Sequence, residues 1–474
     1  MSSSKRGMQA CATPGAQRQD NGTVRPRAMP AGALLLATTV LGGTGVAHAA
    51  DGDNEAAAGS AQTTAAPDPK FALFDRFMEQ GLLVKMPPSR DTIAKDAWGL
   101  RSALAEHDIG IQFLSLNSSA YDLHAPRTQG PQRYNGENLS GMSTQQVLVT
   151  YNFDPQGDDQ KQLIFGAVNT LASWEPLGPR AKISLSRLAY YQSFNRKQWE
   201  LKIGYLSNAL EYVGIYTGGS LAGGTQGLNS VIPFQVGMSR LPFASPGMNL
   251  QYNGRNEFYN KFGIQRSISP RGSQAEIENN EHGFRWRTPD AGTLLIDELG
   301  VKRPATQNTR YLWLRAGAIH NSSDYRRMDG RGESDDNDAY YAAADVQLTR
   351  SESAVVPSQG WNLGATYNVA PSDRNLYTEY FEARLYKLGT FRRRPFDMLA
   401  FNVNRTEFSE EARAAYAARS IPTAHYMDAA TVSYMARVHA GTYLSTALSH
   451  VSNPTFSPKH DDALNLLVSL NLFF

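Results

Sequence analysis

Charged side chains two positions apart, mixed with aromatic ones, are the residues of this sequence best suited to bind a polar ligand. In an extended chain, residues i and i+2 face the same side. A face with charges of both signs and with rings suits sugars, because charged groups hydrogen-bond to hydroxyls and rings stack on C–H faces. The alternative is that these side chains bond to one another or brace an inward-folded loop. The candidate binding residues are Glu200, Lys202, Lys261, Arg285, Arg287, Trp313, Arg315, Glu382 and Arg384, accompanied by Tyr259, Tyr311, Tyr380 and Tyr386.

Sequence signatures of catalysis and of metal or nucleotide binding are missing. No H-x-x-x-H pair and no G-x-S-x-G motif occurs, and the single cysteine is Cys11. The glycine-rich run 214–227 resembles a phosphate-binding loop, but Gly224 stands where the lysine is needed. Ser449 and His450 are adjacent, so in a strand they point to opposite faces and form no dyad. We therefore predict no catalytic residue, no metal site and no cofactor.

The elements that carry the candidate residues are predicted to be β-strands. Alternate residues are apolar through 147–153, 199–205 and 361–369, and the charged candidates occupy the opposite phase. Each strand thus has an apolar face and a polar face. The phase of the segment 293–301 is ambiguous, because Asp297 and Glu298 fall on opposite faces, and neither is assigned. Less regular segments of the same kind are 110–118, 161–169, 182–192, 248–253, 257–268, 283–287, 293–301, 311–319, 377–387, 398–404, 429–438 and 442–451.

The last strand indicates what the apolar faces meet. The sequence DDALNLLVSLNLFF is apolar at every second residue back from Phe474, and the chain stops there on an aromatic residue. Beyond the N-terminal region, no run of about twenty apolar residues could form a membrane-spanning helix. Lipid leaves only a closed sheet as a spanning arrangement of strands. We predict an all-β, transmembrane antiparallel β-barrel of about sixteen strands, with short N-terminal helices. A secreted β-sandwich or β-propeller is the competing fold, because periodicity alone does not exclude it.

The N-terminal region has the features of an export signal. Five basic residues precede an apolar run at 31–46, and the small residues Ala47 and Ala49 flank His48 in a cleavage pattern. We predict a signal peptide at 1–49, a flexible N-terminal or periplasmic segment at 50–90 and a barrel domain at 91–474. Within these, helices are expected in 68–90 and 92–107.

Charge and loop composition fit the same interpretation. The formal net charge of the whole chain is +2, which gives no basic excess for nucleic-acid binding. The segment 322–341 is dense in charge and glycine and is expected to be an exposed loop, and 409–418 is expected to form a short amphipathic helix. Such long polar insertions are typical of the outer loops of membrane barrels.

The sequence also resembles a known family. Asp96 to Ile111, DAWGLRSALAEHDIGI, resembles the D-x-W-G-x-R-x-x-L … G-I opening of the carbohydrate-selective porin family, the group including OprB. The stretches ELKIGYLSNALEY, GGSLAGG and LSHVSNP are similar to that family as well, so the resemblance extends over about 71–474. It implies a sixteen-stranded outer-membrane barrel through which monosaccharides such as glucose diffuse down their gradient. It also implies charged constriction residues, prominently arginine and glutamate.

The partners expected from this resemblance are carbohydrate substrates, outer-membrane lipid and the barrel-assembly machinery, which would recognise the terminal Phe474. A homo-oligomer is left open. Two other functions compete with the sugar channel: a general diffusion porin without sugar preference, and an outer-membrane barrel that serves as an enzyme or adhesin. The first would conduct ions without any effect of sugar, and the second would have a plugged interior or loop-borne catalytic groups.

Overall fold

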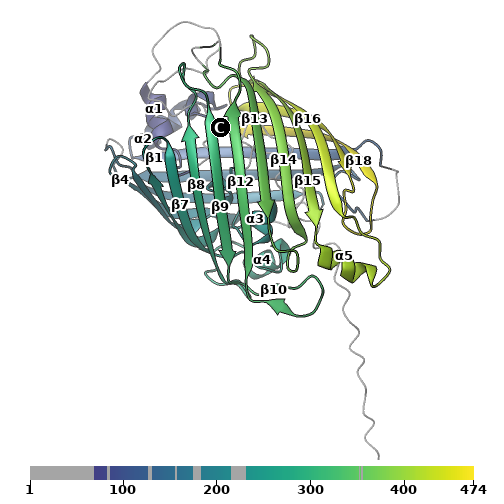
Figure 1. The fold of residues 1–474 in the computed structure, drawn as a ribbon. Helices are drawn as coiled ribbons and strands as arrows, with labels where there is room; N and C mark the ends of the chain where they lie inside the picture. The colour runs from purple at the N-terminus through teal and green to yellow at the C-terminus, as the bar shows by residue number, and fades with distance from the viewer. Residues whose placement is uncertain are drawn as a thin grey trace, which may run out of the picture. The chain divides into compact units, whose positions relative to one another are not determined.

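The computed structural model describes residues 69–82, 86–125, 131–154, 157–174, 183–214, 231–351, 353 and 356–474. In this part of the chain, sixteen strands form one closed barrel in which each strand pairs antiparallel with its neighbours (Figure 1). The barrel is closed by the pairing of β1 with β18. A hairpin formed by the two-residue strands β10 and β11 lies in a connection outside the barrel. The predicted barrel and its approximate strand number are confirmed.

The strands differ in length. They are β1 (Ile109–Asp122), β2 (Ser140–Asn152), β3 (Lys161–Ala172), β4 (Ser184–Phe194), β5 (Trp199–Leu206), β6 (Ser245–Asn253), β7 (Phe258–Arg266), β8 (Thr293–Arg303), β9 (Leu312–Asn321), β10 (Tyr325–Arg326), β11 (Glu333–Ser334), β12 (Asn337–Gln347), β13 (Gly360–Val369), β14 (Tyr377–Leu388), β15 (Met398–Phe408), β16 (Tyr426–His439), β17 (Thr442–Ser452) and β18 (Asp462–Phe473).

The helices are short, and those at 69–76, 100–105, 273–279 and 410–417 lie at the two ends of the barrel (Figure 1). They are α1 (Pro69–Arg76), η2 (Ser89–Asp91), η3 (Ala97–Gly99), α2 (Leu100–Ala105), η4 (Asn208–Leu210), α3 (Val231–Gln235), α4 (Ser273–Asn279) and α5 (Glu410–Ala417). The predicted helix at 409–418 is therefore α5, and the side chain of Ser409 caps it by accepting a 3.0 Å hydrogen bond from the N–H of Ala412. Among the described residues, no helix has the length and apolar character needed to cross a membrane.

Burial in the wall is the reverse of that in a water-soluble protein. On β5, the side chains of Trp199 and Ile203 are 42% and 47% exposed, whereas Lys202 is 2% exposed. The same alternation continues around the barrel, with large apolar residues outward and polar or charged residues inward. Such a wall suits an apolar surrounding and a polar interior, as the strand phases predict.

The last strand, β18, completes the wall by pairing with β1. Phe473 pairs with Leu114 of β1, and the N–H of Phe474 donates a 2.9 Å hydrogen bond to the carbonyl of Phe113. The rings of Phe113 and Phe474 lie 5.2 Å apart, and Phe473 is buried on the inward side. The alternation predicted from the last fourteen residues is thus confirmed.

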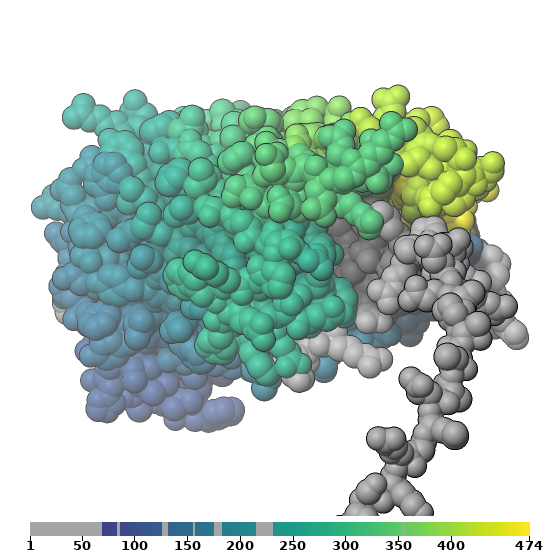
Figure 2. All heavy atoms as spheres, turned by 90° about the horizontal axis from the view of Figure 1, so that it is seen from below, coloured from purple at the N-terminus to yellow at the C-terminus, as the bar shows by residue number. Residues whose placement is uncertain are grey.

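The two ends of the barrel differ in their connections. At the end near α1 and α2, turns such as 195–198, 254–257 and 440–441 are short. The opposite end carries the long connections, with α3, α4, α5 and β10 (Figure 1). Seen from this second end, side chains coloured teal and green gather over much of the barrel (Figure 2).

Two segments differ from the sequence-based prediction. The stretch 283–287 is not a strand but part of the connection between α4 and β8, where Gly283 has a φ of +77°. The segment 322–341, expected to be one exposed loop, contains the β10–β11 hairpin and the first residues of β12. The predicted segments therefore include one false strand and lack one barrel strand, β12, as well as the two short strands β10 and β11. The alanine-rich sequence of β12 gives only a weak apolar alternation, which is why it was missed.

The described parts of the connection between β5 and β6, residues 207–214 and 231–244, pack inside the barrel. Tyr212, Val213 and Ile232 are each fully buried. They belong to an apolar cluster with inward residues such as Ile296 of β8 and Tyr380 of β14. These two parts of the connection therefore pack against the inner wall and narrow the interior next to the charged side chains.

Candidate functional site in the barrel interior

Most of the predicted binding residues face the interior. Glu200 and Lys202 on β5, Lys261 on β7, Trp313 and Arg315 on β9, and Glu382 and Arg384 on β14 all occupy the inward phase of their strands. Tyr259, Tyr380 and Tyr386 are inward as well, and Tyr311 is buried just before β9. The strands bring these charges together in two groups. One group combines wall residues with residues from non-strand segments, and the other belongs to the wall alone.

The first group is called the mixed cluster and consists of Glu79, Arg187, Lys202, Glu211 and Lys261. One oxygen of Glu79 lies 2.9 Å from Nε of Arg187 and 3.1 Å from Nζ of Lys202. Glu211 bridges the two lysines, at 2.9 Å from Lys202 and 3.0 Å from Lys261. All five side chains are buried. The three cations come from β4, β5 and β7, whereas both carboxylates come from segments that are not part of the wall.

Glu79 reaches this position because the chain after α1 runs along the inner wall. Nε2 of Gln162 on β3 donates a 3.1 Å hydrogen bond to the carbonyl of Met78. Three residues later, Nζ of Lys261 on β7 donates a 3.1 Å hydrogen bond to the carbonyl of Gly81. Phe77 is buried between these strands and the start of the barrel. Described residues of the segment 50–90 are therefore attached to the inner wall through Met78 and Gly81.

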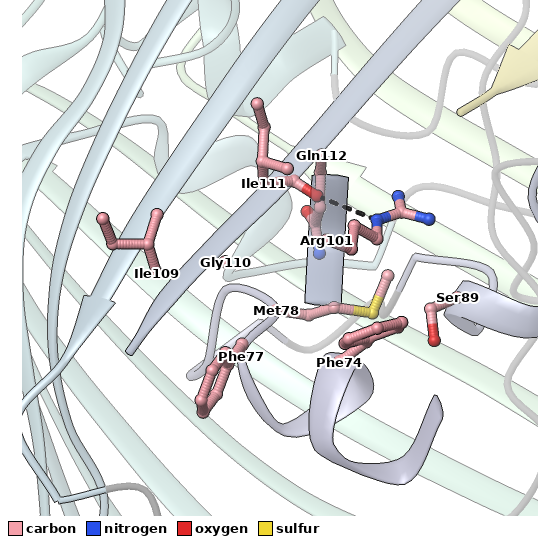
Figure 3. A pocket seen from close by; sticks show the side chains of 9 residues that line it. All are labelled: Phe74, Phe77, Met78, Ser89, Arg101, Ile109, Gly110, Ile111 and Gln112. Atoms are coloured by element: carbon pink, nitrogen blue, oxygen red, sulfur yellow. Dashed lines mark hydrogen bonds between the residues drawn. The ribbon is translucent and has the colours of Figure 1, made fainter. Parts of the chain in front are cut away.

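A small pocket separates α1 from the start of β1 (Figure 3). Phe74, Phe77 and Met78 line one side, and the backbone of β1 around Gly110 lines the other. Arg101 of α2 reaches across it and donates a 3.4 Å hydrogen bond from Nε to the carbonyl of Ile111. The pocket is lined mainly by apolar side chains, so it offers few groups to a polar ligand. The contacts around it attach the N-terminal segment to the barrel.

Electrostatic conditions in the mixed cluster favour ionised groups. Glu211 lies on the connection between β5 and β6, outside the spanning strands. Burial raises its pKa, but the charges of Lys202 and Lys261 outweigh burial and lower the pKa of Glu211 to about 2. Asn249 adds a 2.6 Å hydrogen bond to the same carboxylate. Glu211 is therefore ionised at neutral pH and holds the two lysines together.

The second group is called the wall cluster and consists of Arg315, Asp345, Glu382 and Arg384. Arg384 binds Asp345 with two bonds, of 3.0 Å from Nε and 2.8 Å from Nη2. The third guanidinium nitrogen, Nη1, lies 2.7 Å from a carboxylate oxygen of Glu382. Arg315 approaches the same Asp345 from the other side, at 3.1 Å. Charged residues of β9, β12 and β14 thus form one continuous, hydrogen-bonded arrangement on the inner wall.

Arg315 also holds the inward-folded connection. Its Nε and Nη2 donate hydrogen bonds to the carbonyls of Val213 and Gly214, the latter at 3.0 Å. Its guanidinium lies 3.7 Å from the centroid of the Trp313 ring. Gly214 has a φ of +66°, and a side chain at this position would collide with that ring. Arg315 therefore combines a charged, ring-stacked surface with a bracing role, the alternative considered from the sequence.

An aromatic network continues from this surface. Nε1 of Trp313 donates a 3.0 Å hydrogen bond to the hydroxyl of Tyr259, which donates a 2.7 Å bond to Glu298. Tyr341 donates to the other oxygen of Glu298 at 2.8 Å. Asp297 is exposed on the outer face, so the structure resolves the ambiguous phase of β8 in favour of an inward Glu298.

Arg285 and Arg287 are not on the inner wall, which corrects their predicted placement. Both side chains are exposed on the connection between α4 and β8. In the same connection, the rings of Phe284 and Trp286 contact Tyr205, which belongs to the outward phase of β5. The apolar residues at 284 and 286 imitate an alternating strand, but here they cover the outside of the barrel.

Several charged residues of the interior were not among the candidates. Arg187 lies on β4 next to a shift in register between β3 and β4, which disturbs the simple alternation. Asp345 lies on the missed strand β12. Glu79 and Glu211 lie outside strands, so strand phase could not have found them. The available signal for Glu211 was its position directly after a predicted strand that carries Lys202.

The fold and interior define a class: this is a sixteen-stranded porin-type barrel with a constricted, charged interior. The family model of the carbohydrate-selective porins, OprB family, matches residues 132–438, which is more than half of the chain. The chain therefore belongs to the OprB family of carbohydrate-selective porins. No curated protein sequence matches it significantly.

Solved structures support the fold. The chain is similar to the high-pH structure of Pseudomonas putida OprB, with 15% identity and a TM-score of 0.67 over 80% of this chain and 97% of that one. The low-pH structure of the same protein gives 13% identity and a TM-score of 0.50 over 81% of this chain and 98% of that one. At these identities the similarity concerns the arrangement of strands and does not transfer individual site residues.

Proposed function

We propose that this porin is a sugar channel of the outer membrane, through which monosaccharides such as glucose diffuse down their gradient. The family to which the chain belongs supports the carbohydrate class. In this proposal residues 1–49 are an export signal, residues 91–474 form the barrel domain, and the residues between them lead into the barrel. The channel performs no catalysis and uses no cofactor.

The observation that carries the proposal is the wall cluster beside its aromatic neighbours. Two arginines and two carboxylates lie within hydrogen-bond distance of one another, and Trp313 stacks directly on Arg315. A sugar presents hydroxyls that both donate and accept, together with apolar C–H faces. Charges of both signs next to a ring match that pattern. Glu200 on β5, which is partly exposed, adds a further carboxylate to the polar interior, and Lys202 and Lys261 lie buried in ion pairs beside it.

The charges are paired, which supports passage of neutral solutes over strong binding of ions. Paired charges cost less to keep in a low-dielectric interior than single ones, and they leave weak, exchangeable hydrogen bonds to a solute. A channel needs weak sites of this kind, because a tight site would stop the flow.

The test is single-channel conductance of the purified protein in a planar bilayer, titrated with glucose and other monosaccharides. Sugar entering the interior should reduce the ion current reversibly at millimolar concentrations. Arg384→Gln should weaken this block, and Arg405→Gln, a substitution of an exposed outward arginine on β15, is the matched control. Stable conductance that no sugar changes would identify a general diffusion porin. Absence of conductance would reopen the enzyme and adhesin alternatives.

A further inference from the structure

We propose that Arg187, Lys202 and Lys261 form a carboxylate-binding site on the inner wall, and that the chain itself occupies this site with Glu79. The inference adds to the proposed function a second class of ligand, small organic carboxylates, and names the residue that excludes them. It rests on the proposed function only in that the barrel conducts.

The cations of this site belong to the wall, whereas Glu79, which pairs with Arg187 and Lys202, belongs to a different segment. Arg187, Lys202 and Lys261 lie on β4, β5 and β7, which are fixed by continuous strand pairing. Glu79 arrives from the N-terminal segment and is held there by backbone contacts of its neighbours Met78 and Gly81. The wall therefore presents the same cations whether or not Glu79 is present.

The contacts of Glu79 resemble those of a bound carboxylate ligand. One of its oxygens is shared by Nε of Arg187 and Nζ of Lys202, at 2.9 and 3.1 Å. Nη2 of Arg187 and the second oxygen of Glu79 are buried and have no hydrogen-bond partner among the described residues. The arginine thus retains donor capacity toward the site, and a carboxylate that is free to rotate would bind it with both oxygens.

Charge balance explains why the site needs an anion. Glu211 forms ion pairs with Lys202 and Lys261. Glu298 pairs with Lys261 in the register of β7 and β8, but its carboxylate already accepts hydrogen bonds from tyrosines and from a backbone N–H. Neither of these carboxylates forms an ion pair with Arg187, whose ion-pair partner among the described residues is Glu79. A buried cation without a counter-ion is strongly unfavourable. Loss of the Glu79 charge should therefore draw an anion from solution into the interior.

The experiment compares the chloride-to-potassium permeability ratio, measured as the reversal potential across a bilayer in a KCl gradient without sugar. Glu79→Gln should raise this ratio by about threefold, because a positive interior concentrates anions. Glu106→Gln, the same substitution at an exposed position after α2, is the control and should leave it unchanged. The double variant Glu79→Gln/Arg187→Gln removes one charge of each sign and should return the ratio toward that of the wild type. It also tests the idea if the single variant fails to fold.

A second readout does not depend on conduction. In Glu79→Ala, sodium acetate should raise the temperature of unfolding and lower the chloride permeability, whereas acetamide, which has a similar shape and no charge, should do neither. Acetate should have no such effect on the wild type, whose site is occupied. Equal permeability ratios in Glu79→Gln and Glu106→Gln, or equal effects of acetate and acetamide on Glu79→Ala, would overturn the carboxylate site. If sugar does not block the wild-type channel, that result would count against the proposed sugar channel and leave the carboxylate site untouched.

Discussion

The mixed cluster and the wall cluster contain similar residues but are assembled differently. In the wall cluster, every charge lies on a strand, and Asp345 of β12 sits between arginines of β9 and β14. In the mixed cluster, the strands provide only the cations, and both carboxylates come from segments folded into the barrel. The first arrangement is complete once the barrel closes. The second is complete only after two further segments have been placed.

This difference indicates separate roles for the two clusters. The wall cluster is a fixed group of buried charges beside an aromatic ring, and the proposed function assigns weak, reversible sugar contacts to this part of the interior. The mixed cluster joins the N-terminal segment and the β5–β6 connection to the wall, so it determines how much of the interior stays open. Substitutions in the wall cluster should alter the stability of the barrel and sugar binding together. Substitutions in the mixed cluster should alter the charge of the interior and the access of ions to it.

The largest effect is expected for Asp345→Asn. This change leaves Arg315 and Arg384 buried with Glu382 as their remaining carboxylate, and breaking a buried pair of this kind costs about 3–5 kcal/mol. The barrel should unfold at lower urea concentration or temperature, measured by the mobility shift of the folded form in gel electrophoresis. Sugar block of the surviving channels should be lost at the same time.

Asp338→Asn is the control for this substitution. Asp338 lies on the same strand but faces outward, where it pairs with the exposed His320 at 2.9 Å. An exposed pair contributes less than about 1 kcal/mol, so the unfolding midpoint should change little. If both variants are equally stable, the wall cluster does not stabilise the barrel.

Arg315→Ala should have the second largest effect, mainly on sugar binding. The substitution removes the cation stacked on Trp313. Loss of one hydrogen bond from this charged group to a sugar hydroxyl would cost about 1.5–3 kcal/mol, which is tenfold or more in affinity. The sugar titration of the single-channel current measures this change. The wall strands keep their pairing, so we expect the barrel to assemble. Failure to assemble would mean that Arg315 acts only as a brace.

A smaller effect is expected in a pH titration, which probes the mixed cluster through Glu211. The pKa of Glu211 is lowered from 4.5 to about 2, so its stabilising contribution is fully present above about pH 4.5 and is lost as the pH falls through about 2. Its surroundings are Lys202, Lys261, Glu79 and Glu298, with Asn249 as a neutral partner. We expect the ratio of chloride to potassium permeability to be constant from pH 7 to 5.

Below about pH 3, protonation of Glu211 should raise that ratio by about twofold, because two lysines lose their shared counter-charge. Glu211→Gln should show the higher ratio already at pH 7. A steep change between pH 7 and 5 in the wild type would contradict the lowered pKa of Glu211.

The sequence predicts the wall of this protein better than its interior. The alternation of apolar residues identifies most strands and their inward phase, because each strand separates an apolar surrounding from a polar interior. Lys202, Lys261 and Arg384 were therefore placed correctly. What the sequence does not contain is the path of segments that fold back inside. Glu79 and Glu211 have no periodic context, and only the folded chain brings them to Arg187 and Lys202.

False and missed strands have a related physical cause. The exposed rings at 284 and 286 alternate as in a strand because they cover the outside of the wall. The real strand β12 is weak in alternation because its outward residues include small alanines. Apolar periodicity thus reports which side chains face the apolar surroundings, and a loop lying against the wall meets that condition as well as a strand does.

The smallest effect is expected for the double variant Arg285→Gln/Arg287→Gln, which tests this interpretation directly. Both side chains are exposed on the connection between α4 and β8, so their removal should change stability by less than about 0.5 kcal/mol. Sugar block should stay within error of the wild type, in contrast to Arg315→Ala measured in the same titration. A loss of sugar block comparable to that of Arg315→Ala would show that this connection reaches the path of the solute. The division between a binding wall and non-binding connections would then be wrong.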